Sequence, residues 1–156
     1  MKAINILSAF LFISCIGIGC KEKTAKEKEA EYLNNVVSKI GSAGQYKWVV
    51  ILPGLGCHGC IQEGEAFMQK NIGNKNIYFV LTKVESLKIL QNKINVKVQD
   101  HTNIFLDKDN AIRIPSDNNI YPCIIQMNGE NLKDYQFQAP YNSQAFAKLE
   151  ALLAVK

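Results

Sequence analysis

Two cysteines separated by two residues, Cys57 and Cys60, lie between an apolar run and a helical pattern. The run from Tyr46 to Leu52 is continuous and rich in β-branched residues, as in a strand buried on both faces. Apolar residues at helical spacing then continue to about Lys70. The chain must therefore carry a pair of thiols at the junction of a buried strand and a helix, which favours folds in which strands and helices alternate.

The remainder of the chain continues this alternation. The expected elements are a strand at 77–81, a helix at 84–94, a short strand at 103–107, a hairpin of strands at 123–127 and 132–137, and a last helix capped by Asn142 or Ser143. Residues 45–156 therefore predict one α/β domain with a central mixed sheet and helices on both faces. A chain of 156 residues is long enough for one such domain but too short for two.

The first nineteen residues have the pattern of an export signal. Lys2 precedes an apolar stretch that ends at Gly19, and Cys20 and a charged segment follow. The stretch falls just short of the roughly 20 apolar residues that span a membrane. It is similar to a bacterial lipoprotein signal, so we expect removal of residues 1–19, lipid on Cys20 and a membrane-anchored protein of the bacterial cell envelope that faces the periplasm or the exterior. The alternatives are lipid on Cys15 and an uncleaved N-terminal anchor.

Residues 20–44 are expected to form a charged tether and one helix. Residues 21–31 are nearly all Lys, Glu, Ala and Thr, which predicts a solvated segment. From Leu33 to Ile40, apolar residues recur at helical spacing, and glycines follow at positions 41 and 44. We expect this helix to pack on the outside of the domain.

Charge and cysteine content narrow the function classes. The net charge is +4, but the lysines are scattered without the aromatic interleaving of a nucleic-acid-binding stripe. In an exported, lipidated chain the remaining cysteines are Cys57, Cys60 and Cys123, in an environment where disulfides persist. Three thiols cannot all pair, so the close pair is the expected disulfide and Cys123 stays free. A lone cysteine in an apolar strand is most often a core residue.

The position of the pair at a helix start has chemical consequences. Free N–H groups and partial positive charge at a helix N-terminus favour a thiolate, which lowers the pKa of the first cysteine below the ordinary value of about 8.5. Cys57 is therefore the expected nucleophile, and Cys60 the thiol that resolves the mixed disulfide. His58 can add positive charge or a hydrogen bond to the Cys57 thiolate and lies where substrate would bind.

The strand, the C-x-x-C motif and the helix together resemble the thioredoxin fold, and more closely its membrane-anchored redoxin-type thiol–disulfide oxidoreductases, over about residues 45–156. The resemblance implies a three-layer sandwich and an enzyme that exchanges disulfides with envelope proteins, uses no cofactor and is served by a separate redox partner. The segment Ile120–Ile125 resembles the family's cis-proline loop. By that resemblance, Tyr121 and Pro122 contact the substrate backbone beside the cysteines.

Two positions depart from the family pattern, and a third matches that of some anchored relatives. The usual Trp before the first cysteine is Gly56, and the buried acid of thioredoxin is replaced by Ile51. Some anchored relatives carry a Glu three residues after the second cysteine, and Glu63 stands there. The resemblance implies that Glu63 accepts the Cys60 proton, while a solvated glutamate in the first helical turn is an equally good interpretation.

Other interpretations of the motif stay open. A zinc site lacks a second cysteine pair, and haem attachment would need His in place of Ile61. The peroxidatic Thr and Pro pattern is missing ahead of the cysteines. Cys57 and Cys60 could instead bind Cu(I), with His58 or His101 completing the site. The pair could also be a structural disulfide in a non-catalytic binding domain. Either direction of exchange, reduction or oxidation, is compatible with the sequence.

Overall fold

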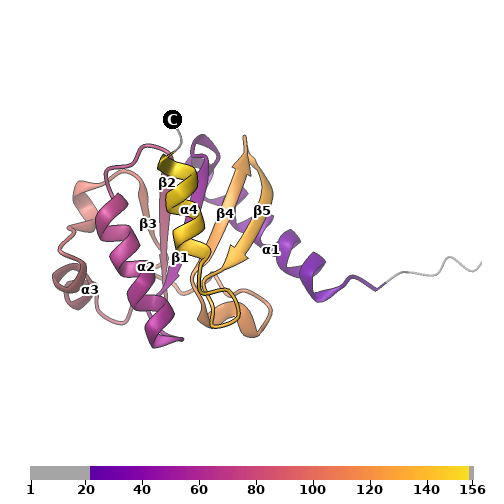
Figure 1. Ribbon diagram of the computed structural model, residues 1–156, viewed down its shortest axis with the longest axis horizontal. Helices are drawn as coiled ribbons and strands as arrows, with labels where there is room; N and C mark the ends of the chain where they lie inside the picture. Colours follow the sequence, from indigo (N-terminus) through magenta and orange to yellow (C-terminus); the bar gives the residue numbers. More distant parts are fainter. Residues whose placement is uncertain (1–21, 155–156) are drawn as a thin grey trace, which may run out of the picture.

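The computed structural model describes residues 22–154 and contains a five-stranded mixed sheet. Its strands, in the spatial order β3-β2-β1-β4-β5, are β1 (Trp48–Pro53), β2 (Ile77–Thr82), β3 (Ile104–Leu106), β4 (Cys123–Asn128) and β5 (Asn131–Phe137) (Figure 1). The first three strands run parallel to one another, and the β4–β5 hairpin continues the sheet in antiparallel pairing from β1. The sheet therefore has one parallel half and one antiparallel half, which meet at β1.

Within residues 22–154, four α-helices cover the two faces of the sheet. They are α1 (Ala25–Lys39), α2 (His58–Asn71), α3 (Leu87–Ile94) and α4 (Ala145–Ala154). The connections in this part of the chain contain the short 3-10 helices η1 (Gly41–Gln45), η2 (Val98–Asp100) and η3 (Asp117–Ile120). On one face, Leu33 of α1 shares a core with Val49 of β1. On the other face, Phe67 of α2 and Leu149 of α4 share a core with Val50. The predicted α/β architecture, with helices on both faces of a mixed sheet, is confirmed.

The central strands explain why two segments of the sequence are continuously apolar. Every residue of β1 and of β2 is buried, because alternate side chains enter the core under α1 and the core under α2 and α4. The edge strand β5 is instead mostly exposed or half-buried and carries polar residues. How deeply each of these strands is buried thus follows from its position in the sheet.

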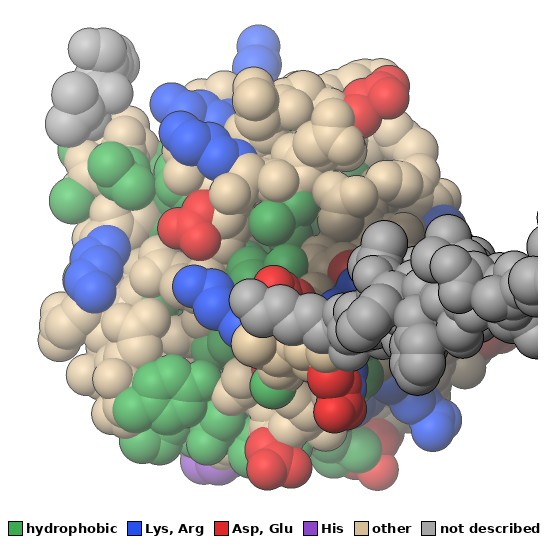
Figure 2. All heavy atoms as spheres, turned by 90° about the vertical axis from the view of Figure 1, so that its right-hand side faces the viewer, with side chains coloured by type: hydrophobic (Ala, Val, Ile, Leu, Met, Phe, Trp, Pro, Cys, Tyr) green, Lys and Arg blue, Asp and Glu red, His purple; other side chains and the backbone are tan. Residues whose placement is uncertain are grey.

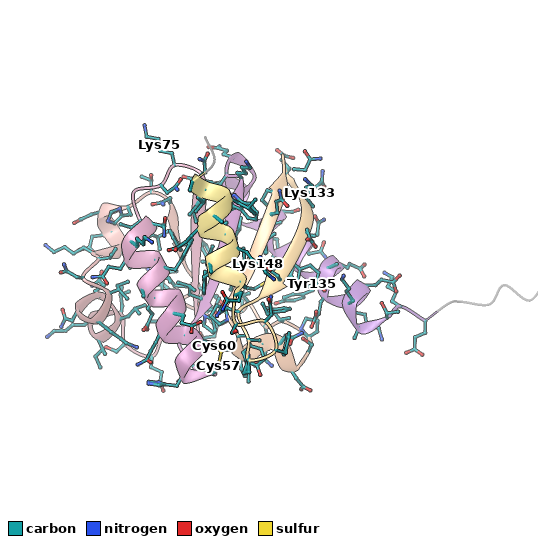
Figure 3. The ribbon with its side chains drawn as sticks, viewed as in Figure 1. Cys57, Cys60, Lys75, Lys133, Tyr135 and Lys148 are labelled. Carbon is teal, nitrogen blue, oxygen red and sulfur yellow. A yellow bond between two sulfur atoms is a disulfide. The ribbon has the colours of Figure 1, made fainter. Side chains whose placement is uncertain are left out.

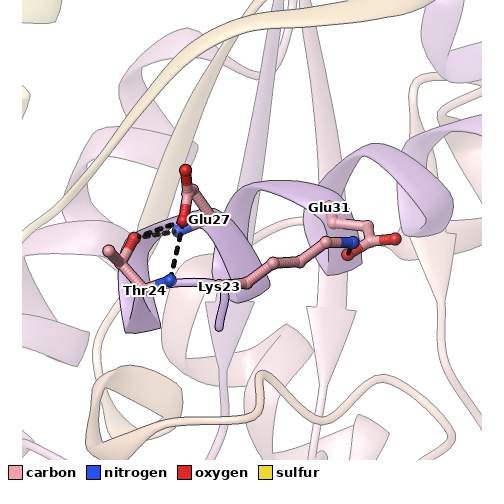
Figure 4. Close-up of polar contacts among 4 residues, drawn as sticks. All are labelled: Lys23, Thr24, Glu27 and Glu31. Atoms are coloured by element: carbon pink, nitrogen blue, oxygen red, sulfur yellow. Dashed lines mark hydrogen bonds and ion pairs between the residues drawn. The ribbon is translucent and has the colours of Figure 1, made fainter. Parts of the chain in front are cut away.

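The prediction of a solvated tether at residues 21–31 is wrong for most of that segment. Helix α1 already begins at Ala25, because Thr24 and Glu27 form a reciprocal capping box (Figure 4). The Glu27 backbone N–H donates to the Thr24 hydroxyl at 3.2 Å, and the Glu27 carboxylate accepts from the Thr24 backbone N–H at 2.7 Å. The bond from the Thr24 backbone N–H, and next a bond from the Thr24 hydroxyl to the same carboxylate at 3.0 Å, lower the pKa of Glu27. The charged residues are therefore the outer side of a helix, and Glu29 on its inner side is buried.

Two other helix starts differ from the predicted ones. Helix α3 begins at Leu87 rather than Val84, because the Ser86 side chain accepts from the N–H of Ile89 and caps the helix. Helix α4 begins at Ala145, and neither expected cap acts as one. The Asn142 side chain donates to the Phe137 carbonyl at 3.0 Å. The Ser143 backbone carbonyl accepts from the Gln138 side chain at 2.9 Å.

The expected signal segment, residues 1–19, and the expected lipid-bearing Cys20 lie outside the described residues. Within residues 22–154, no helix combines the length and the apolar character that crossing a bilayer requires. On the side of the molecule seen in Figure 2, acidic and basic side chains are interspersed rather than gathered by sign.

Candidate functional site

Cys57 and Cys60 form a disulfide at the carboxyl end of β1, as the sequence predicted for their position. Cys57 is the N-cap residue of α2, Cys60 lies in its first turn, and their Cα atoms are 5.4 Å apart. Figure 3 places the pair at the lower end of the molecule, where α2 begins. Cys57 is half-buried, whereas Cys60 is only 7% exposed. The two sulfurs therefore differ in access, and an attacking group from outside meets Cys57 first.

The segment that contains η3 packs against the strand–helix junction. The Cys57 backbone N–H donates to the carbonyl of Ile120 at 3.0 Å. Gly56 has a φ of +150°, and a Cβ atom built on it would lie 2.2 Å from the Ile120 oxygen. This close backbone contact leaves no room for a side chain at position 56, so the Trp that the resemblance would place there could not be accommodated.

Pro122 contacts α2 just beyond the cysteines, as the resemblance implied for its place. A Cβ atom on Gly64, four residues after Cys60, would lie 3.3 Å from Pro122 Cγ. The predicted cis bond, however, is wrong. All peptide bonds among residues 22–154 are trans, and Tyr121 has the extended backbone angles usual before a proline.

Tyr121 lies in an aromatic pair near the cysteines. Its ring packs edge-on against that of Tyr141, with centroids 6.0 Å apart, and the Tyr141 hydroxyl donates to Asn118 Oδ1 at 2.7 Å. Tyr121 is half-buried and Tyr141 is exposed. The pair is a preformed apolar contact surface beside Pro122, in the place where the resemblance puts the substrate backbone.

Glu63 is exposed on α2, and its carboxylate accepts a hydrogen bond from Gln138 Nε2. Gln138 is buried and also connects two other elements. Its backbone N–H donates to the Pro122 carbonyl at 2.9 Å, and its Oε1 accepts from the Phe146 N–H at 3.1 Å. Gln138 could not be predicted as a site residue, because nothing in its local sequence pattern distinguishes it from a surface glutamine. Gln138 therefore forms hydrogen bonds to Glu63, to Pro122 and to the first turn of α4.

The two histidines lie in different parts of the molecule. His58 is exposed and is the first residue of α2, next to Cys57. His101 precedes β3, whereas Cys57 follows β1, and these strands run parallel in the same sheet. The two residues therefore lie at opposite ends of the sheet, so His101 does not complete a Cu(I) site with the cysteines. Among the described residues, no group of three or more His, Cys, Asp or Glu is placed to hold a metal ion.

A buried carboxylate on α1 holds the segment that contacts Cys57. Glu29 is 6% exposed and accepts hydrogen bonds from the Ser116 hydroxyl, from Asn118 Nδ2 at 2.8 Å and from the Tyr135 hydroxyl at 3.0 Å. Ser116 in turn caps η3, which ends at Ile120. The first helix, which sequence patterning assigned only to the outside of the domain, thus positions the backbone beside the disulfide.

We expect Glu29→Ala to lower the free energy of unfolding by about 2 kcal/mol, because it removes a buried carboxylate that three half-buried donors share as acceptor. The matched control is Glu31→Ala on the same helix. Glu31 forms an exposed ion pair with Lys23 at 2.6 Å, and such pairs contribute under about 1 kcal/mol (Figure 4). Urea denaturation of both variants measures the difference, and equal values would show that the Glu29 contacts do not stabilise the fold.

Cys123 is a core residue, which confirms the interpretation favoured from the sequence. It is fully buried in β4, opposite Ile51 of β1. Ile51, where thioredoxin carries its acid, is thus part of the same core. Burial, and next the charge of Glu29, raise the pKa of the Cys123 thiol.

The raised pKa makes stability depend on alkaline pH. In the unfolded chain the Cys123 thiol ionises near pH 8.5, whereas in the folded protein it stays protonated. The contribution of this buried, neutral thiol to the free energy of unfolding is therefore complete below that pH and is lost as the pH rises toward the folded pKa. In a Cys57→Ala/Cys60→Ala background, where no disulfide can rearrange, we expect the free energy of unfolding to fall more steeply from pH 8 to 10 with Cys123 than with Cys123→Ala. Parallel pH profiles in urea denaturation would contradict this.

Comparison of the chain with models of protein families, with curated proteins and with solved structures finds no match. The residues and their arrangement are therefore the basis of the functional assignment.

Proposed function

We propose that this protein is a thiol–disulfide oxidoreductase with a thioredoxin-like fold, exported to the bacterial cell envelope and anchored in a membrane by lipid on Cys20. The observation that carries the proposal is the disulfide at the start of α2, in which Cys57 is half-buried and Cys60 is buried. Asymmetric access divides the roles, because a substrate can reach Cys57 while Cys60 is held back to resolve the intermediate.

In the reductive direction, the catalytic cycle consists of two thiol–disulfide exchange steps. The Cys57 thiolate attacks one sulfur of a substrate disulfide, a mixed disulfide forms, and the first substrate thiolate leaves. Cys60 then loses its proton and attacks Cys57 Sγ, which releases the second substrate thiolate and leaves the Cys57–Cys60 disulfide. Two electrons pass to the substrate. A separate dithiol partner restores the reduced pair, and the same steps in reverse describe a disulfide donor.

Groups near the two cysteines stabilise the thiolate, contact the substrate and accept a proton in this cycle. The N-terminus of α2 stabilises the Cys57 thiolate, and His58 adds a hydrogen bond or positive charge. Tyr121 and Pro122 receive the substrate backbone. We assign Glu63 as acceptor of the Cys60 proton, since it lies three residues further along α2 and its carboxylate is fixed by Gln138.

The topology supports the finer fold assignment. The strands β2, β1, β4 and β5 are adjacent in that order, β4 pairs antiparallel with both β1 and β5, and α2 and α4 cover one face. The C-x-x-C pair follows β1 and Pro122 precedes β4, so both lie at the same end of the central strands, against α2. These are the relations that the proposed fold requires between motif, helix and proline segment.

The reduction potential of the Cys57–Cys60 pair tests the proposal. The full chain in detergent is equilibrated across a thiol/disulfide series, and the alkylated fraction is determined by mass. We expect a potential between about −270 and −120 mV, the range of redox-active pairs, with the upper end indicating a disulfide donor and the lower end a reductase. A value below about −300 mV would identify a structural disulfide and overturn the proposal in favour of a non-catalytic domain.

A further inference from the structure

A cleft of about 430 Å³ opens at the carboxyl ends of the parallel strands, the same end of the sheet at which the disulfide lies. Its walls come from the segments that follow β1, β2 and β3 and from η3. Its lining includes Leu55, Lys83, Glu85, Asn110, Arg113 and Asn119. The carboxyl edge of parallel strands is where open α/β sheets bind ligands.

Two residues that line the cleft are connected to Cys57 through the backbone. Leu55, on one wall, is two residues before Cys57. Asn119, on another, directly precedes Ile120, whose carbonyl accepts from the Cys57 N–H. A polypeptide whose cysteine reaches Cys57 therefore brings residues two or three positions away to the cleft, because each residue spans up to about 3.5 Å.

Two cations line the cleft without an ion pair. Lys83 Nζ donates to the carbonyl and to the side-chain oxygen of Asn119, at 2.8 and 2.6 Å. An ammonium group has three donors, so one remains for a ligand. Arg113 donates through Nε to the Asn110 carbonyl at 3.2 Å, which leaves the other guanidinium donors. Within residues 22–154, no carboxylate lies within 4.0 Å of either cation, although Glu85 lines the same cleft.

The backbone and the electrostatics both set Lys83 apart from a solvated surface lysine. Its φ is +52°, a conformation that non-glycine residues adopt rarely, and its side chain is half-buried. Burial, and next the positive charge of Arg113, lower its pKa. A bound anion would relieve the repulsion between these two cations.

We propose that this cleft binds the carboxylate of an Asp or Glu side chain that flanks the cysteine of a substrate polypeptide, with Lys83 and Arg113 as the recognising residues. The inference rests on the proposed oxidoreductase function and adds the substrate class, namely disulfides in acidic segments. Leu55 supplies an apolar wall for the methylene groups of such a side chain.

The test uses three disulfide peptides that are blocked at both ends and differ only in a Glu, Gln or Lys two residues from the reacting cysteine. The rate constant for their reaction with the reduced full-length protein is measured by stopped flow at low ionic strength. We expect the Glu peptide to react about tenfold faster than the Gln peptide, the size of one charge-assisted hydrogen bond, and the Lys peptide to react slowest.

Variants of the two cleft cations distinguish recognition of the substrate carboxylate by these residues from an effect of the protein's overall charge. Lys83→Gln should bring the Glu and Gln peptides to similar rates, and Arg113→Glu should make the Lys peptide the faster one. Lys75→Gln is the matched control, since Lys75 is exposed at the opposite end of the molecule (Figure 3), so this variant should keep the Glu preference. A preference that survives in Lys83→Gln and Arg113→Glu, or equal rates in the unmodified protein, would overturn the inference and leave the oxidoreductase standing. No reaction with any peptide would overturn the oxidoreductase and the inference with it.

Discussion

We expect replacement of Cys57 with serine to lower the rate constant of disulfide exchange by about a thousandfold or more, because a hydroxyl neither ionises near neutral pH nor attacks sulfur as a thiolate does. Cys57 is the more exposed of the paired cysteines and lies at the start of α2, so we expect neither Cys60 nor Cys123, which are buried, to replace it. Exchange is followed with a fluorogenic peptide disulfide. Cys123→Ala is the control, since this buried thiol should be dispensable for the reaction.

The companion variant Cys60→Ser should behave differently. It retains the nucleophile but lacks the resolving thiol, so it should accumulate mixed disulfides between Cys57 and its partners in the native envelope. These adducts are separated by non-reducing electrophoresis and disappear on reduction. Unimpaired exchange in Cys57→Ser, or the lack of any adduct in Cys60→Ser, would contradict the proposal that Cys57 is the nucleophile and Cys60 the resolving thiol.

Gly56→Ala should lower the free energy of unfolding by about 3–5 kcal/mol. The added methyl group would lie 2.2 Å from the Ile120 oxygen and 2.8 Å from its Cα, so the backbone itself has to move. The φ of +150° at this residue is a second cost, since residues with a Cβ atom rarely adopt it. Urea denaturation with the disulfide intact measures the effect.

Gly59 provides the matched control within the same motif. No atom lies within 4 Å of a Cβ built there, and the residue is part of α2. Gly59→Ala should therefore leave the stability unchanged or raise it by up to about 1 kcal/mol, because alanine is the better helix former. Similar losses in both variants would mean that the contact between Gly56 and Ile120 is not what constrains position 56.

The parts of the fold that the sequence predicted are those encoded by local periodicity. The apolar runs at 46–52 and 77–81 correspond to the two central strands, and the segment after Cys57 forms the predicted helix. These signals are strong because a strand buried on both faces has no polar positions to interrupt the pattern.

The contacts that shape the candidate site were missed for a common reason. Glu29 lies 89 positions before Asn118, Glu63 lies 75 before Gln138, and Lys83 lies 36 before Asn119. Hydrogen bonds between residues so distant in sequence leave no local pattern. The capping box at Thr24 is different, since its Thr and Glu are three residues apart and could have been found. The high charge of that segment led instead to the prediction of a tether.

The early start of α1 determines how far the domain can travel from an anchor. If Cys20 carries lipid, only residues 21–24 connect it to the helix, and four residues span at most roughly 14 Å. The domain would then move in a thin layer above the lipid headgroups, with its first helical turn close to them. Encounters with other anchored proteins become a two-dimensional search at high effective concentration, whereas disulfides deeper in the surrounding space lie beyond its reach.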